Sequence, residues 1–108
     1  MTIEERKRIA IAEASGFYNI NPAYWRGWRD ERIEGKLDTI ERAIPDYLND
    51  LNAMHEAEKV LRKVIYPSYT DVIIGDRMHD YAEHLGYAID ATAALRADAF
   101  IKVLNLEY

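Results

Sequence analysis

The stretch from Ile44 to Ile65 constrains the fold more than any other part of the chain, because its apolar residues recur at helical spacing. Pro45 disfavours a helix running in from upstream, since a proline biases the residue before it away from helical angles. Asp46, Asn49 and Asp50, just beyond it, can all accept hydrogen bonds from the free backbone N–H groups at a helix start. These features predict an amphipathic helix over Asn49–Ile65 that carries much of the core.

The apolar face of this predicted helix faces the interior, and the charged residues sit largely off that face. We expect Met54 and Leu61 to be buried and to contact the last helix of the chain at Leu95 or Phe100. The members of the apolar face are Leu48, Leu51, Met54, Ala57, Val60, Leu61, Val64 and Ile65.

A second helix is predicted at the beginning of the chain, over Ile3–Ala14. Thr2 can cap this helix, and Glu5 three residues on completes a capping-box pattern. Gly16 is suited to end it, because glycine readily adopts the left-handed conformation found just beyond many helices.

The second half of the chain contains one clear helix and one ambiguous stretch. Asp90 or Thr92 can cap a last helix over Ala91–Leu104, whose small alanines allow close packing. Ser68–Leu85 keeps helical spacing overall, whereas Tyr69–Ile74 has strand-like residues. Helix is the favoured interpretation of this stretch.

The segment between the first two predicted helices, Phe17–Ala43, is the least regular part of the chain, since asparagine, proline and glycine punctuate it. Leu37–Ala43 is compatible with one or two helical turns. The segment also holds both tryptophans, interleaved with arginines.

We therefore expect residues 1–108 to form one domain with a mainly α fold, in which about four helices are covered by an irregular Trp-rich segment. The alternative is an α+β fold with a small sheet packed between helices, built from Tyr69–Ile74 and residues near Tyr24–Arg29. The four expected helices are Ile3–Ala14, Asn49–Ile65, Ser68–Leu85 and Ala91–Leu104.

Composition excludes several classes of function. The formal net charge of −5 argues against a general nucleic-acid binder, which needs a basic face for the phosphates. The chain has no cysteine, which rules out disulfides and thiolate metal sites. It also shows neither a secretory signal nor a long apolar run, so we expect a cytoplasmic protein that does not enter a membrane.

Three segments together resemble a family of small proteins of tailed bacteriophages and prophages. They are Leu48–Lys59, the near-N-terminal Ile11–Phe17, and Ala91–Phe100, which matches an Ala-Thr-Ala-x-x-Arg-Ala-x-Ala-Phe pattern. Phe17 departs from the family, whose members usually have tryptophan there. The chain is also loosely similar to the phage ABA-sandwich domain. The resemblance implies phage origin and action in the host cytoplasm, but no activity.

The crowded Trp-rich segment supplies the candidate binding residues, Trp25, Trp28, Arg29 and Arg32. Aromatic rings and guanidinium groups are the side chains most used at protein–protein contacts, and they can also hold an anion. In a helical turn the two tryptophans would face one way, with both arginines along the same side. In an extended strand the tryptophans would point to opposite faces, and at most one of them could contact a partner. The alternative is that the tryptophans cover one edge of the core while the arginines pair with neighbouring acids.

The histidines suggest a different chemistry, since their order with the aspartates is that of the HD-type metal phosphohydrolases. The residues concerned are His55, His79, Asp80, Asp90 and Asp98. A His-Asp dipeptide is common by chance, so we expect no bound metal, no cofactor and no catalytic residue. Other catalytic templates, such as a Gly-rich phosphate loop or a nucleophile elbow, are missing from the sequence.

Three functions remain open at this point. The favoured one is a non-catalytic phage accessory protein that binds a host or phage macromolecule, for instance to inhibit a bacterial antiviral defence. The second is a protein that binds or sequesters a nucleotide or another small anion. The third is the metal phosphohydrolase. A protein partner is favoured, and a homo-oligomer is compatible with the sequence.

Overall fold

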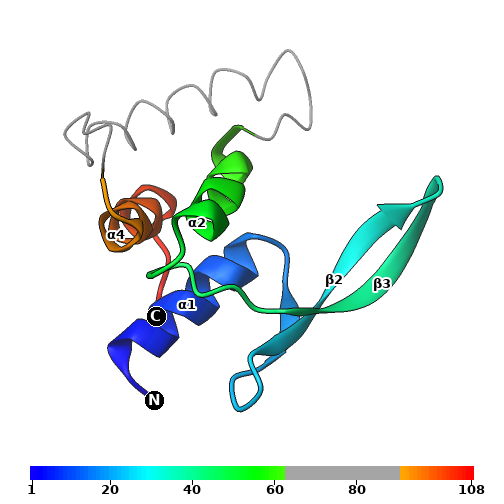
Figure 1. Ribbon diagram of the computed structural model, residues 1–108, viewed down its shortest axis with the longest axis horizontal. Coiled ribbons are helices and arrows are strands. Elements are labelled where there is room, and N and C mark those ends of the chain that lie inside the picture. Colours follow the sequence, from blue (N-terminus) through cyan, green and yellow to red (C-terminus); the bar gives the residue numbers. More distant parts are fainter. Residues whose placement is uncertain (63–90) are drawn as a thin grey trace.

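The computed structural model describes residues 1–62 and 91–108, which form a helical body and a three-stranded antiparallel sheet (Figure 1). The sheet order is β1-β2-β3, so β2 lies in the middle. In chain order the elements are α1 (Ile3–Ala14), β1 (Tyr18–Asn21), β2 (Arg26–Ile33), β3 (Lys36–Ala43), α2 (Leu51–Glu58), the 3₁₀ helix η1 (Lys59–Arg62) and α4 (Ala93–Leu104).

The expectation of a mainly α fold is wrong, because a sheet occupies the segment that was expected to be irregular. The class is α+β, the alternative considered, but with different strands. Only β2 overlaps the expected strand near Tyr24–Arg29, and β3 replaces the helical turns expected over Leu37–Ala43. The other expected strand, Tyr69–Ile74, and the favoured helix Ser68–Leu85 lie outside the described residues.

A two-residue turn explains why β2 and β3 form a hairpin. Glu34 and Gly35 have φ angles of 50° and 80°, so both adopt left-handed conformations, and Ile33 pairs with Lys36 across the turn. Turns with positive φ at both central residues match the right-handed twist of the flanking strands. Glycine at the second position makes this conformation accessible at little cost.

The helices begin where side chains can cap them. Thr2, Asp50 and Thr92 each accept hydrogen bonds from backbone N–H groups two or three residues further on, at 3.0 to 3.3 Å. The prediction for α1 is confirmed at both ends, and α4 starts two residues later than predicted. The helix predicted over Asn49–Ile65 appears as α2 followed by η1, up to the end of the described stretch.

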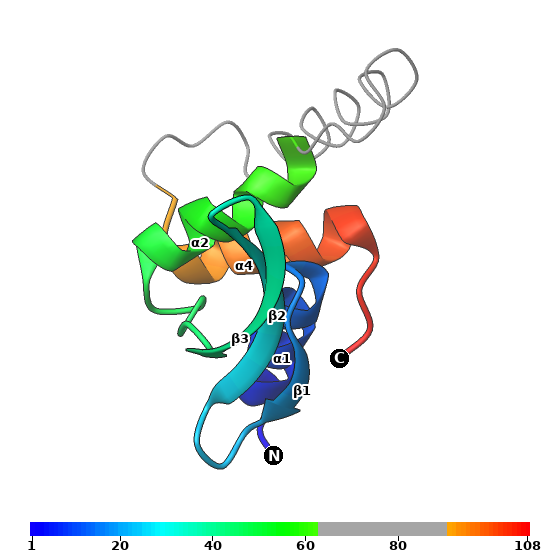
Figure 2. The ribbon, with the colours of Figure 1, turned by 90° about the vertical axis from the view of Figure 1, so that its right-hand side faces the viewer.

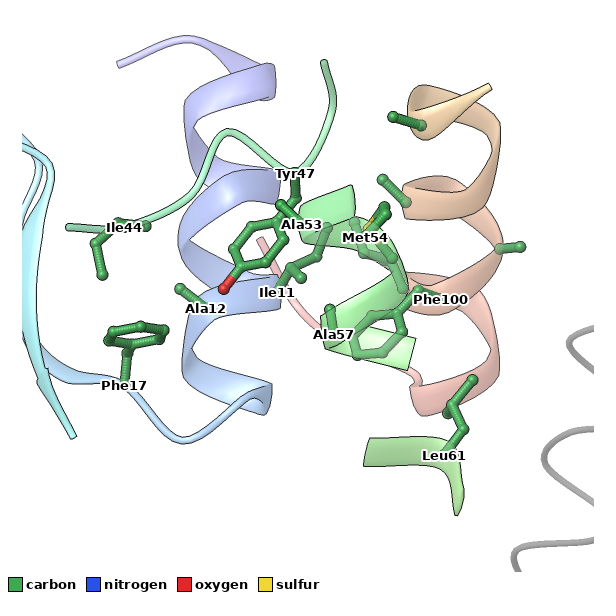
Figure 3. Close-up of a cluster of buried hydrophobic side chains, with 14 residues drawn as sticks. Ile11, Ala12, Phe17, Ile44, Tyr47, Ala53, Met54, Ala57, Leu61 and Phe100 are labelled. Atoms are coloured by element: carbon green, nitrogen blue, oxygen red, sulfur yellow. The ribbon is translucent and has the colours of Figure 1, made fainter. Parts of the chain in front are cut away.

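The core lies where α1, α2 and α4 meet, with α4 in contact with both other helices (Figure 2). Its largest fully buried side chains are Ile11, Met54, Leu61 and Phe100, seen together in Figure 3. The predicted burial of Met54 and Leu61 is confirmed, and Phe100 shares their cluster. The other expected contact, Leu95, is 57% exposed, so it lies on the solvent-facing side of α4 rather than against Met54 and Leu61.

The hairpin leaves the helical body at Gly27, where strand and core approach closely. A Cβ atom at this position would lie only 2.8 Å from Ile44 Cδ1 and 3.3 Å from Ile20 Cγ1. The face of β2 that carries Gly27 therefore points toward the body and is called the inner face. Beyond this junction the hairpin projects away from the helices (Figure 1).

Candidate binding surface

The alternation of side chains along β2 divides the Trp-rich segment between two faces. Trp28 and Arg32 share the outer face of the strand, whereas Arg29 lies on the inner face with Gly27. Trp25 precedes the strand in a left-handed conformation, with φ of 50°. The helical turn that would have aligned these residues is therefore wrong, and the four candidates do not form one surface.

The outer face carries an exposed aromatic pair. Tyr18 of β1 stands directly opposite Trp28 of β2, and their exposed fractions are 39% and 38%. The Tyr18 hydroxyl donates a 2.9 Å hydrogen bond to Asp30 Oδ1, which also accepts from the Thr39 hydroxyl at 3.1 Å. Residues from all three strands thus hold one side of the pair in place.

Charges of both signs border this aromatic pair. Arg26 lies two residues before Trp28 on the same face, and its Nη2 is 3.2 Å from Oε1 of Glu41, which pairs directly with Trp28 across the hairpin. Arg32 lies four residues beyond Trp28, roughly 13 Å at the usual rise of a strand. There its Nη1 donates to the Gly35 carbonyl oxygen at 3.3 Å. Arg32 therefore belongs to the hairpin tip rather than to the immediate border of the aromatic pair.

Trp25 has a structural role that the sequence did not indicate. The guanidinium of Arg8 stacks on its ring, 3.9 Å from the centroid. The same guanidinium donates to the Pro45 carbonyl oxygen at 2.8 Å and to that of Ile44. The Trp25 carbonyl oxygen in turn accepts from Ile44 N–H at 2.7 Å. Trp25 thus helps join α1 to the segment between β3 and α2.

Arg29 faces the body, where its guanidinium lies 5.0 Å from the centroid of the Phe17 ring. Its Nε is 3.6 Å from Glu31 Oε2, but Arg42 holds both oxygens of that carboxylate at 3.0 Å. The Arg42 hydrogen bonds hold the pKa of Glu31 below its ordinary value of 4.5 and raise that of Arg42. The bidentate partner of Glu31 is thus Arg42 rather than Arg29.

Tyr18 is the member of this surface that the sequence did not single out. The signal available for it was the Glu34-Gly35 turn, which marks a hairpin and hence a strand over Arg26–Ile33. Predicting that Tyr18 lies beside Trp28 also requires a third strand before the hairpin and the register of its pairing with β2. That register is irregular, because it shifts between Tyr18 and Asn21.

The structure offers no support for a metal centre within residues 1–62 and 91–108, where no three potential ligands cluster. His55 is exposed, and Asp98 accepts from Lys7 Nζ at 2.8 Å. The other residues of the His…His-Asp pattern, His79, Asp80 and Asp90, lie outside the described part. Of the helices seen in the same residues, none is long and apolar enough to cross a membrane.

Comparison with known proteins adds nothing to this picture: no protein-family model, no curated protein and no solved structure matches the chain.

Proposed function

We propose that the protein is a non-catalytic binding protein that contacts a protein partner through the outer face of its sheet. The observation that carries the proposal is the exposed pair of Tyr18 of β1 and Trp28 of β2, on the outer face of the sheet at the base of the projecting hairpin (Figure 1). Tyrosine, tryptophan and arginine dominate the energetics of protein interfaces. The proposed function includes no catalytic activity, because the sequence contains none of the common nucleophile or phosphate-loop motifs.

A protein fits this surface better than a nucleic acid. Arg26 and Arg32 are balanced by Asp30 and Glu41 on the same face, and the chain as a whole carries a net charge of −5. Affinity for nucleic acids depends on an excess of positive charge facing the phosphates. A mixed-charge border around an aromatic centre is instead the usual composition of a protein interface.

The resemblance to small phage proteins supports one biological setting for this binding. In that setting the partner is a host or phage macromolecule in the bacterial cytoplasm, and binding it inhibits an antiviral defence. Such a role needs one accessible binding surface, and the outer face of the sheet supplies it.

Affinity capture from infected host cells tests the proposal, with three tagged proteins compared by quantitative mass spectrometry. The unaltered chain and Ile33→Ala, which removes an exposed apolar side chain from the inner face of the same strand, should retain the same partner. Trp28→Ala should lose it at least tenfold. Circular dichroism and thermal melting of each variant show whether the fold is kept.

Retention of the same partner by a folded Trp28→Ala protein contradicts the proposal, as does failure of the unaltered chain to enrich any protein. If Trp28→Ala unfolds, Arg26→Glu takes its place. This variant reverses an exposed charge beside the aromatic pair while keeping the tryptophan, and it should also weaken capture at least tenfold.

A further inference from the structure

A pocket of about 470 Å³ lies between the inner face of β2 and helix α2, on the side of the sheet opposite to Trp28. This volume is within the range of pockets that hold small ligands. Its walls are largely apolar, with charged groups among them. The lining residues that matter here are Phe17, Tyr47, Ala57, Arg29, Glu56 and Lys59.

Two largely buried aromatic rings are among the apolar lining residues, together with Pro45, Ala57 and Val60. Phe17 and Tyr47 are 5% and 2% exposed, and Figure 3 shows the hydroxyl end of Tyr47 pointing toward Ala12 and Phe17. Burial raises the pKa of the Tyr47 phenol, against a smaller opposite effect of the nearby Ser15 hydroxyl. Ser15 Oγ is itself buried without a hydrogen-bond partner in the part of the chain that the structure describes.

Because of Arg29, the pocket lining carries more positive than negative charge. The Glu56 carboxylate is paired with Lys59 Nζ at 2.9 Å, and both oxygens of Glu31 are bound by Arg42. Among the described residues, the only carboxylate that forms an ion pair with Arg29 is that of Glu31, at a long distance of 3.6 Å. The guanidinium carbon of Arg29 lies over the Phe17 ring, 5.0 Å from its centroid, in the geometry of a cation–π contact.

We propose that this pocket binds a small carboxylic acid with an aromatic or apolar body. The carboxylate pairs with the Arg29 guanidinium, whose planar fork matches two carboxylate oxygens. The body lies against Phe17, Tyr47 and Ala57. A single negative charge suits the site better than a nucleoside triphosphate, because the charged lining residues, Arg29 and Lys59 against Glu56, leave a surplus of one positive charge.

Binding of 4-phenylbutyrate tests this, with 4-phenylbutanamide as a ligand of the same shape without charge. In two-dimensional NMR spectra of the unaltered protein, the acid should shift the Ala57 methyl and Phe17 ring resonances saturably, with about millimolar affinity. The amide should bind at least tenfold more weakly, because it cannot form the ion pair. Equal binding of the two ligands, or no shift at these residues, overturns the proposal.

Two arginine variants locate the charge that the acid uses. Arg29→Gln should reduce acid binding at least tenfold and leave amide binding unchanged, whereas Arg26→Gln, on the outer face, should change neither. Unchanged acid binding by Arg29→Gln assigns the ion pair elsewhere and overturns the proposal. If Arg29→Gln does not fold, the comparison of acid and amide on the unaltered protein decides. Because the two faces of β2 are tested separately, loss of either site leaves the other result standing.

Discussion

The helical body and the β2–β3 hairpin are stabilised in different ways. The body buries apolar side chains, and among its described residues no polar or charged residue is buried. In β3, by contrast, every residue is exposed except Ile40, which is half-buried. The hairpin relies on its turn, its backbone ladder and cross-strand ion pairs such as Arg42 with Glu31. Exposed ion pairs contribute little to stability.

With the outer face of the sheet as the proposed binding surface, this difference places stability and recognition in separate parts of the molecule. Substitutions in the body act on the core and hence on the whole fold. Substitutions on the hairpin act on solvent-facing side chains, so they can change what the surface binds at a small cost in stability. The exposed pair of Tyr18 and Trp28 lies on the second kind of surface.

The largest effect that tests this comparison comes from the same substitution made in both regions. Leu61→Ala removes a fully buried side chain from the core and should lower the free energy of unfolding by about 2–5 kcal/mol. Leu37→Ala removes a side chain that is 68% exposed on β3 and should cost about 0.5 kcal/mol or less. Urea denaturation of the two variants measures both values. Equal losses would show that the hairpin is part of the cooperative core.

The sequence predicted the body better than the hairpin, and the reason is physical. Helical spacing of apolar residues and the caps at Thr2 and Asp50 report directly on burial and on local hydrogen bonding. The hairpin has charged residues on both faces, so it shows no alternation of apolar and polar residues from which a strand could be predicted. The sequence feature that still indicates a hairpin is the Glu34-Gly35 turn.

The candidate site was predicted only in part for the same reason. Trp28 was singled out as an exposed binding residue and is exposed, but its side of the sheet depends on strand alternation. A helical turn placed Arg29 beside it, whereas the strand places Arg29 on the opposite face. Trp25 could not be assigned from local sequence, because its partner Arg8 comes from a different element.

A second, intermediate effect is expected where the body meets the base of the hairpin. Arg8→Met keeps the aliphatic stem but removes the guanidinium that binds the Ile44 and Pro45 carbonyl oxygens and stacks on Trp25. The loss of charged hydrogen bonds to part-buried acceptors should cost about 1.5–3 kcal/mol. Arg6→Met, on an exposed position of the same helix, is the matched control and should cost about 0.5 kcal/mol or less.

Urea denaturation of these two variants also sharpens the comparison between the regions. In a Trp28→Phe background, the fluorescence of Trp25 should change in Arg8→Met, because the guanidinium no longer stacks on its ring. If Arg8→Met and Arg6→Met are equally stable, the junction is held by packing at Gly27 alone, and the hydrogen bonds to the two carbonyl groups are dispensable.

The smallest effect is expected within the hairpin, as a dependence of stability on pH. Arg42 holds the pKa of Glu31 below its ordinary value of 4.5, so the ionised form is favoured in the folded protein. The resulting stabilisation is fully present above about pH 4.5 and is lost as the pH falls through the lowered pKa. Thermal melts of the unaltered protein and Glu31→Gln should therefore differ slightly at pH 7 and converge toward pH 3. In an Arg42→Gln background the Glu31→Gln difference should shrink, and 1 M salt should weaken it in the unaltered background. A difference that persists undiminished to pH 3 would show that Glu31 stabilises the hairpin by packing rather than by charge.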